Sequence, residues 1–132
     1  MQKDEVPETE IWAQTEFGNY PALPVAPDEV AVEALLDALL SSRSPVIICG
    51  GGVVISGGES ALAEFAEALN LPVATTISGQ GSLPETHPYC VGVVGSNGGI
   101  PATRKIIDDA DLVFFVSCRA GSVTTERWRS PN

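Results

Sequence analysis

The sequence has little of the residues on which most catalytic and metal sites depend. It contains one histidine, His87, in 132 residues, which gives little support to a metal cluster or a Ser-His-Asp triad. Aromatic residues make up 6% of the chain against 44% hydrophobic residues, so we expect one domain with an aliphatic core. No apolar run could span a bilayer, and the N-terminus lacks the apolar segment of a signal peptide. These absences predict a globular, cytoplasmic protein.

Basic residues are also scarce. Seven lysines and arginines stand against 17 acidic residues, which gives a net charge of −10. Such a chain is repelled by nucleic acids and by anionic membranes, so neither is expected as a main partner. The three cysteines have no CxxC spacing and an odd count, which indicates buried, reduced thiols at Cys49, Cys90 and Cys118.

The chain divides near residue 27. Residues 1–27 are acidic and proline-rich, and we expect an extended interdomain linker with Ile11, Trp12 and Phe17 as anchors on a neighbouring surface. Apolar linker residues of this kind predict that the isolated chain associates, as a dimer. From residue 28 to 132, helical and strand patterns alternate, which is typical of βαβ units with a parallel sheet. The helices are expected at 28–40, at 59–69 and around 103–110, and the strands at 45–49, 72–76, 89–94 and 112–117.

Glycine or small polar residues follow each expected strand, at 50–52, 76–79, 95–99 and 117–119. The carboxyl ends of parallel strands share one edge of the sheet, and ligands bind in the crevice there. Glycines let a ligand approach the backbone, so a nucleotide or phosphate site is one interpretation. Tight turns between strands and helices also use glycine, so a purely structural role is the alternative.

Sharper catalytic motifs are missing. The segment that begins at Gly50 has isoleucine, Ile55, where the GxGxxG motif needs its third glycine. The expected helix also begins too late for that motif. Gly58 stands where a Walker A motif needs lysine, and there is no GxSxG. His87 precedes a proline and is expected in a turn, and the acidic cluster Asp108, Asp109 and Asp111 is expected at a solvated helix end. We therefore expect no catalytic and no metal-binding residues in this chain.

Arg119, Arg127 and Arg129 gather after the last expected strand, with Trp128 between two of them. Guanidinium groups bind phosphate bidentately, so a phosphate clamp is one reading, and an exposed polar tail is the other. A four-stranded sheet that stops here would have a bare edge, which predicts a domain truncated at its C-terminus.

A series of ordered motifs runs from about Pro27 to Thr125: Arg43 to Gly52, Leu71 to Thr76, Gly79-Gln80-Gly81, Pro84 to Pro88, Gly92, Gly95 and Ala110-Asp111-Leu112. Together these motifs resemble the central domain of thiamine-diphosphate-dependent enzymes, in the acetolactate-synthase-like branch. The resemblance implies a Rossmann-like, DHS-like nucleotide-binding domain of three α/β/α layers, set between two thiamine-binding domains. In such enzymes the flanking domains hold thiamine diphosphate and Mg²⁺, and this sequence contains no Gly-Asp pair of the kind that binds them.

The resemblance also implies what this domain binds and does. Relatives carry FAD, ADP or nothing here, and the positions matching FAD contacts are Gly50, Gly51, Gly52, Thr76, Ile77, Ser78, Asn97, Gly98 and Arg119. Asn97 stands where flavin-binding members have histidine, and Ala120-Gly121-Ser122 replaces an acidic stretch. The full enzyme would be a 2-oxo acid decarboxylase or carboligase, a transferase or lyase, and this chain alone would be inactive. The alternative function is a stand-alone nucleotide-binding or interaction module without catalysis.

Overall fold

The computed structural model describes residues 7, 14–15, 18 and 25–131. Most of the expected linker, including Ile11, Trp12 and Phe17, lies outside the described residues. The rest alternates between helices and strands as the sequence predicts. In chain order the elements are α1 (Glu29–Ser41), β1 (Pro45–Cys49), α2 (Gly52–Ile55), α3 (Glu59–Leu69), β2 (Val73–Thr75), the 3-10 turn η3 (Ile77–Gly79), β3 (Cys90–Val93), α4 (Pro101–Asp108) and β4 (Leu112–Val116).

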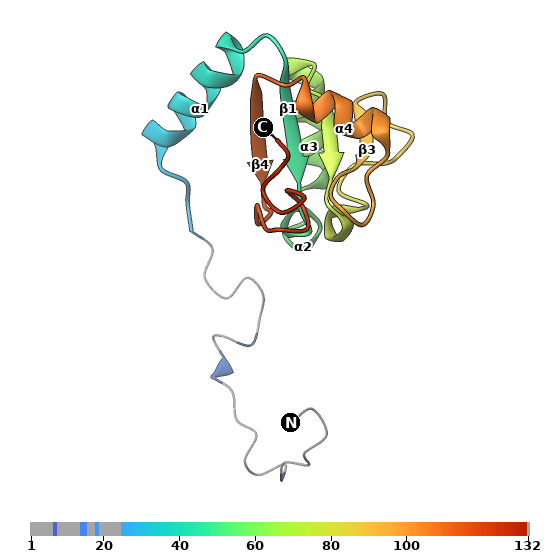
Figure 1. The fold of residues 1–132 in the computed structure, drawn as a ribbon. Coiled ribbons are helices and arrows are strands. Elements are labelled where there is room, and N and C mark those ends of the chain that lie inside the picture. The colour runs from blue at the N-terminus through green and yellow to red at the C-terminus, as the bar shows by residue number, and fades with distance from the viewer. Residues whose placement is uncertain (1–6, 8–13, 16–17, 19–24, 132) are drawn as a thin grey trace.

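The four strands form one parallel sheet in the order β3-β2-β1-β4 (Figure 1). β1 occupies the middle, where Ile47 pairs with Val73 of β2 and with Phe114 of β4. After β3 the chain returns to the other side of β1, so the direction of winding reverses between β1 and β4. This strand order is that of the first four strands of a Rossmann fold.

Helices cover both faces of the sheet, α3 behind it and α4 in front (Figure 1). Alternate residues of β1 divide between the two cores, because side chains along a strand point to opposite faces. Ile47 and Cys49 join the core beneath α1, α2 and α3, and Val46 and Ile48 join the core beneath α4. The three-layer α/β/α architecture expected from the sequence is confirmed.

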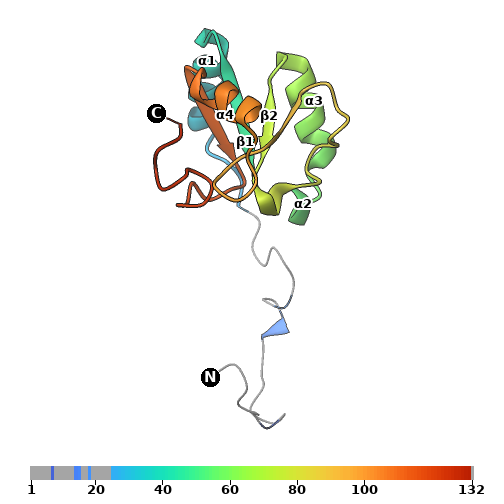
Figure 2. The same cartoon turned by 45° about the vertical axis from the view of Figure 1, so that its right-hand side comes forward.

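The helix α1 packs on the sheet mainly through its C-terminal half. The Asp28 carboxylate accepts a hydrogen bond from the Ala31 N–H at 3.0 Å and caps the first turn. Leu35 and Leu39 pack into the core, whereas Val30 and Leu40 are 75% and 69% exposed. Figure 2 shows α1 at the side of the sheet from a second angle. The helix contributes one row of apolar side chains to the domain and leaves others at the surface.

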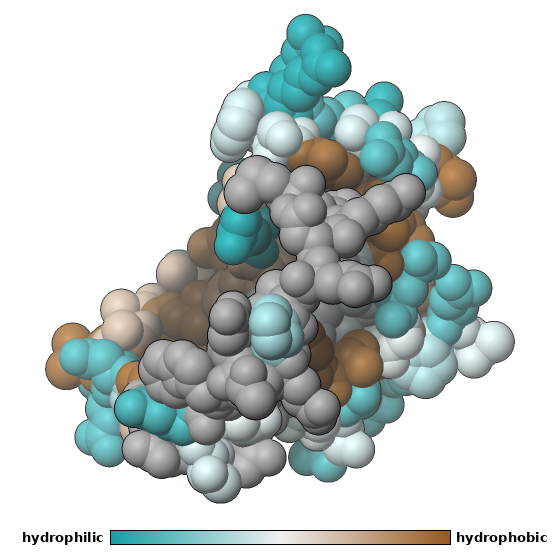
Figure 3. Space-filling view, turned by 90° about the horizontal axis from the view of Figure 1, so that it is seen from below, coloured by the Kyte–Doolittle hydropathy of each residue, from teal (hydrophilic) through white to brown (hydrophobic). Residues whose placement is uncertain are grey.

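An apolar groove of about 230 Å³ lies beside β4 on the α3 side of the sheet, and its lining includes Val53, Leu62, Phe65, Phe114 and Val116. Seen from the end where the strands finish, hydrophobic surface coloured brown shows on both sides of the grey atoms (Figure 3).

β4 pairs only with β1 among the described strands, so it is an edge strand, as the sequence predicts.

Two sequence-based expectations need correction. A short helix, α2, begins at Gly52 directly after β1, whereas the sequence predicts the first helix after this strand at Glu59. Four residues are too few to show a helical period, so the pattern had no signal for it. Among the cysteines only Cys49 is buried; Cys90 and Cys118 are half-buried, and all three are free thiols. In the described part of the chain, no helix is both long and apolar enough to cross a membrane.

Asp111 joins the start of β4 to the turn before β1. Its carboxylate accepts hydrogen bonds from the N–H groups of Arg43 and Ser44, both at 2.9 Å, and from the Ser42 hydroxyl. These hydrogen bonds, led by that from Ser42, lower the pKa of Asp111 from 3.8 to about 2. The expectation of a solvated acidic cluster therefore misses a structural role for this one carboxylate.

Asp111→Asn should reduce the acid sensitivity of the fold. Because the pKa of the folded state is lowered, the carboxylate stabilises the protein above pH 3.8, and this contribution is lost as the pH falls through about 2. The variant should unfold at lower urea concentration than the wild type at pH 6, with a smaller difference at pH 2. Asp109→Asn, which removes only a surface pair with Lys105, is the control. Equal differences at both pH values would contradict the role given to Asp111.

Candidate functional site: a cavity at the carboxyl ends of the strands

A cavity of about 480 Å³ opens where β1, β2 and β4 end. It lies at the reversal of winding between β1 and β4, the place where open α/β sheets bind their ligands. Its volume falls in the range of small-molecule sites. The lining residues come from the segments after these three strands, including the helix α2, and from the C-terminal segment: Gly51, Gly52, Ile55, Thr76, Ser78, Ser117, Cys118, Arg119, Gly121, Ser122, Val123 and Thr124.

The loops around the cavity approach one another too closely for side chains at certain positions. A Cβ atom on Gly50 would stand 2.2 Å from the Cβ of Cys118, and one on Gly79 would stand 2.4 Å from the carbonyl oxygen of Cys49. A Cβ on Gly51 would stand 2.7 Å from the carbonyl oxygen of Ser78. Close packing alone therefore requires glycine at these three positions. The close approaches also show that the three loops meet at one edge of the sheet.

The structure brings together five of the nine predicted site residues. Gly51, Gly52, Thr76, Ser78 and Arg119 line the cavity. The other four do not line it. Gly50 is packed behind the wall, Ile77 is 44% exposed and Asn97 is exposed. A Cβ on Gly98 would stand 2.8 Å from Cγ1 of Val93 and 3.6 Å from Cγ1 of Ile77.

The polar lining is uncharged except for one guanidinium. Five lining residues carry hydroxyl groups, none carries a carboxylate, and Arg119 is the sole charged residue. The Thr76 hydroxyl accepts a hydrogen bond from the Gly79 N–H at 3.1 Å and lies 3.3 Å from the Ser78 hydroxyl. In a chain of net charge −10, this is a wall suited to an anionic group, because nothing in it repels negative charge.

Two thiols lie at or behind this wall. Cys118 lines the cavity, and burial raises the pKa of its thiol. Cys49 is buried behind it, and burial raises the pKa of that thiol to about 11. A thiol is a poor nucleophile until it loses its proton, so neither cysteine is prepared for nucleophilic chemistry at neutral pH.

The sequence places Ser117 at this edge of the sheet, within residues 117–119, and there it has a φ of 47°, in the left-handed region. It does not predict Ser122, Val123 and Thr124 as site residues. These three reach the cavity because the chain turns back after Arg119. The Ser96 N–H donates to the Val123 carbonyl at 3.0 Å, a contact across 27 positions of sequence. Such a distant pairing gives no local pattern from which these residues could be found.

The remaining candidates lie outside the cavity. His87 is in a turn as expected, with Nε2 3.1 Å from Oε1 of Glu67 and Nδ1 accepting from the Tyr89 N–H. Arg127 and Arg129 are exposed and do not line the cavity with Arg119. The described residues contain no group of three His, Cys, Asp or Glu side chains arranged to hold a metal ion.

Gly50→Ala should destabilise the fold by about 1–3 kcal/mol, the usual cost of forcing extra atoms into a packed region. The new methyl group would collide with Cys118 and with the Ser117 carbonyl oxygen, 2.6 Å away. Urea unfolding measures the difference. Gly121→Ala is the matched control, because the nearest atom to its added Cβ is 3.9 Å away. Similar losses in both variants would mean that the close approach at Gly50 is not the cause.

Comparison with known proteins assigns the fold to a family. The family model described as "Thiamine pyrophosphate enzyme, central domain" matches residues 32–132. The chain is 40% identical over 102 residues to a 3D-(3,5/4)-trihydroxycyclohexane-1,2-dione hydrolase of Clostridium perfringens, covering 77% of this chain and 16% of that protein. It is 35% identical over 94 residues to the acetolactate synthase isozyme 3 large subunit of Escherichia coli, covering 71% and 16%.

A solved structure from Mycobacterium smegmatis, assigned to the thiamin diphosphate-dependent enzymes, has the same fold. The TM-score is 0.59 at 28% identity, over 69% of this chain and 17% of the other. The chain thus spans about a sixth of the length of the proteins it resembles. Since the family model covers most of the chain and the sheet has the matching topology, this chain belongs to the central-domain family of thiamine pyrophosphate enzymes.

Proposed function

We propose that the strand-edge cavity binds the phosphate groups of a nucleotide, FAD or ADP, and that this is the function of the domain. The observation that carries the proposal is the lining, which has one guanidinium, five hydroxyl groups and no carboxylate. Guanidinium and hydroxyl groups are the side chains that most often hold phosphate. Gly51 and Gly52 would let the ligand lie close to the backbone.

The residues present fit a nucleotide better than they fit other cofactors of these enzymes. Arg119 would bind a phosphate group, Thr76 and Ser78 would donate hydroxyl hydrogen bonds, and Gly51 and Gly52 would leave the space. The described residues offer no carboxylate cluster for Mg²⁺. Thiamine diphosphate and Mg²⁺ are therefore assigned, in this proposal, to flanking domains of a larger protein of which residues 28–132 form part of the central domain, with residues 1–27 as a linker.

For the larger protein we propose the acetolactate-synthase-like chemistry of a 2-oxo acid decarboxylase or carboligase. The flanking domains would hold thiamine diphosphate, which would supply carbanion chemistry for reactions at the carbonyl of a 2-oxo acid. The relatives include a hydrolase named for a cyclic dione as well as acetolactate synthase subunits, so proteins with this domain differ in the bond they act on. In this proposal the present chain binds a nucleotide, catalyses nothing alone, and works beside flanking domains in an oligomer.

Arg119→Met should weaken ADP and FAD binding by about 10-fold or more, because a hydrogen bond to a charged group contributes about 1.5–3 kcal/mol. Isothermal titration at fixed ionic strength measures the dissociation constants. Arg127→Met removes the same charge from an exposed position outside the cavity and is the matched control. Equal weakening in both variants would point to unspecific attraction, and a wild type that binds neither nucleotide would overturn the proposal.

A bound nucleotide should protect Cys118 from alkylation. Iodoacetamide reacts with thiolates, so the raised pKa of Cys118 predicts slow labelling at pH 7 that quickens as the pH rises. ADP should slow labelling of Cys118, which lines the cavity, and leave Cys90 of β3 unchanged. Peptide mass spectrometry reports both rates in one sample. Unchanged labelling of Cys118 at saturating ADP would place the nucleotide elsewhere.

A further inference from the structure

The C-terminal segment forms one wall of the cavity, and its outer side is attached to α4. We define residues 121–130 as the clasp. Its first four residues, Gly121 to Thr124, line the cavity, whereas Glu126 and Ser130 contact side chains of α4. The clasp therefore connects the cavity wall to a helix that does not touch the cavity.

The clasp has a backbone conformation that needs support. Glu126, Arg127 and Trp128 have φ angles of 49°, 61° and 60°, three non-glycine residues in succession in the left-handed region. This conformation is unfavourable for residues other than glycine, because it brings the Cβ atom close to the following carbonyl oxygen. Strained backbone of this kind persists only where surrounding contacts hold it, and it is found at ligand sites more than elsewhere.

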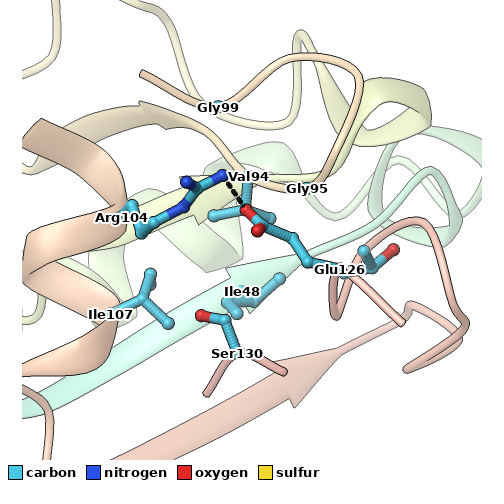
Figure 4. Close-up of a pocket in the computed structure, with 9 residues that line it drawn as sticks. Ile48, Val94, Gly95, Gly99, Arg104, Ile107, Glu126 and Ser130 are labelled. Atoms are coloured by element: carbon cyan, nitrogen blue, oxygen red, sulfur yellow. Dashed lines mark hydrogen bonds and ion pairs between the residues drawn. The ribbon is translucent and has the colours of Figure 1, made fainter. Parts of the chain in front are cut away.

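Three sets of contacts hold the clasp. Arg104 of α4 forms an ion pair with Glu126, with Glu126 21% exposed in its side chain (Figure 4). The Ser130 hydroxyl donates to Oδ1 of Asp108 at 2.9 Å, and the Ser96 N–H donates to the Val123 carbonyl at 3.0 Å. Gly95, with a φ of 101°, leaves room for that last contact, since a Cβ there would stand 2.6 Å from the Val123 oxygen.

The clasp is also coupled to its own wall residues from within. The buried Thr125 hydroxyl donates to the Gly121 carbonyl and accepts from the Trp128 N–H, both at 3.0 Å. A movement of the left-handed turn would thus be passed to Gly121 at the cavity. Under the turn, side chains of Ile48, Ile107 and Val94 enclose a void of only about 10 Å³ with Arg104 and Glu126, so the clasp fits closely on this face (Figure 4).

The ion pair has an electrostatic consequence as well. Glu126 stands two positions after Thr124, which lines the cavity, and an unpaired charge at Glu126 would oppose an anion in the cavity. Arg104 compensates it. From these observations we infer that Arg104 and Glu126 are positioning residues: their ion pair fixes the Gly121–Thr124 wall and neutralises Glu126, so that the cavity accepts a phosphate group at Arg119. The consequence for binding rests on the proposed function, whereas the conformational role does not.

The test compares Arg104→Met, Glu126→Gln and the exchanged pair Arg104→Glu with Glu126→Arg. Titration with ADP should give a dissociation constant about 5-fold higher in Glu126→Gln, within the usual range of coupling between sites. The increase should be larger in Arg104→Met, where the carboxylate is left unpaired. The exchanged pair should come back to within about 2-fold of the wild type. Lys105→Met, on the same helix but paired with Asp109, should bind ADP as the wild type does.

Hydrogen exchange without nucleotide provides a second readout, which does not depend on the proposed function. The Thr125 and Ser96 amides, bonded to Gly121 and Val123 of the clasp, should exchange faster in both single variants and recover in the exchanged pair. Amides of β1 should stay as protected as in the wild type. If the wild type binds no nucleotide, the proposed function fails, and the hydrogen-exchange rates alone then test the positioning role of Arg104 and Glu126. Unchanged exchange at Ser96 and Thr125 in both single variants overturns the positioning role.

Discussion

The burial of β1 on both of its faces and along both of its edges is the constraint on which the rest of the structure depends. Val46 through Cys49 are at most 3% exposed, and the strand pairs with β2 on one side and β4 on the other. A strand buried in this way must be apolar at every position, and helices must cover both sides of its sheet. Its parallel neighbours end at the same edge, so three loops have to meet where β1 stops.

The meeting of these loops explains both the glycines and the cavity. At the end of β1 the backbone after β2 comes so close that Gly79 has no room for a Cβ between Cys49 and Gly50. Further out the loops separate, and small hydroxyl residues leave a space whose one charge is Arg119. Close packing and ligand binding are therefore compatible explanations for these glycines. The contact that requires glycine at position 50 also fixes the position of the loop that carries Cys118 and Arg119.

The sequence predicts the elements of the fold well, and it predicts part of the lining of the candidate cavity, for physical reasons. Apolar periodicity and caps are local signals, so α3 and its left-handed end at Asn70, with a φ of 54°, agree with the expected helix and stop. The sheet edge follows from the alternation of strands and helices, which placed Gly51, Thr76 and Arg119 together. The clasp has no such signal, because Arg104 and Glu126 are 22 positions apart and meet only in the folded chain. The same holds for Asp111, whose partners lie 67 to 69 positions earlier.

Charge connects the site with the rest of the molecule. A chain of net charge −10 opposes the approach of any nucleotide, and screening at physiological salt limits this effect to about 8 Å. The attraction of an anion to the cavity therefore depends on the charges nearest to it. The side chains that line the cavity include no carboxylate, and Glu126 is paired with Arg104. Relatives named as a hydrolase and as acetolactate synthase subunits share this domain. Among the residues that line the cavity, an anionic group would meet Arg119 as its one charged neighbour, so the charge of this lining differs in sign from that of the chain as a whole.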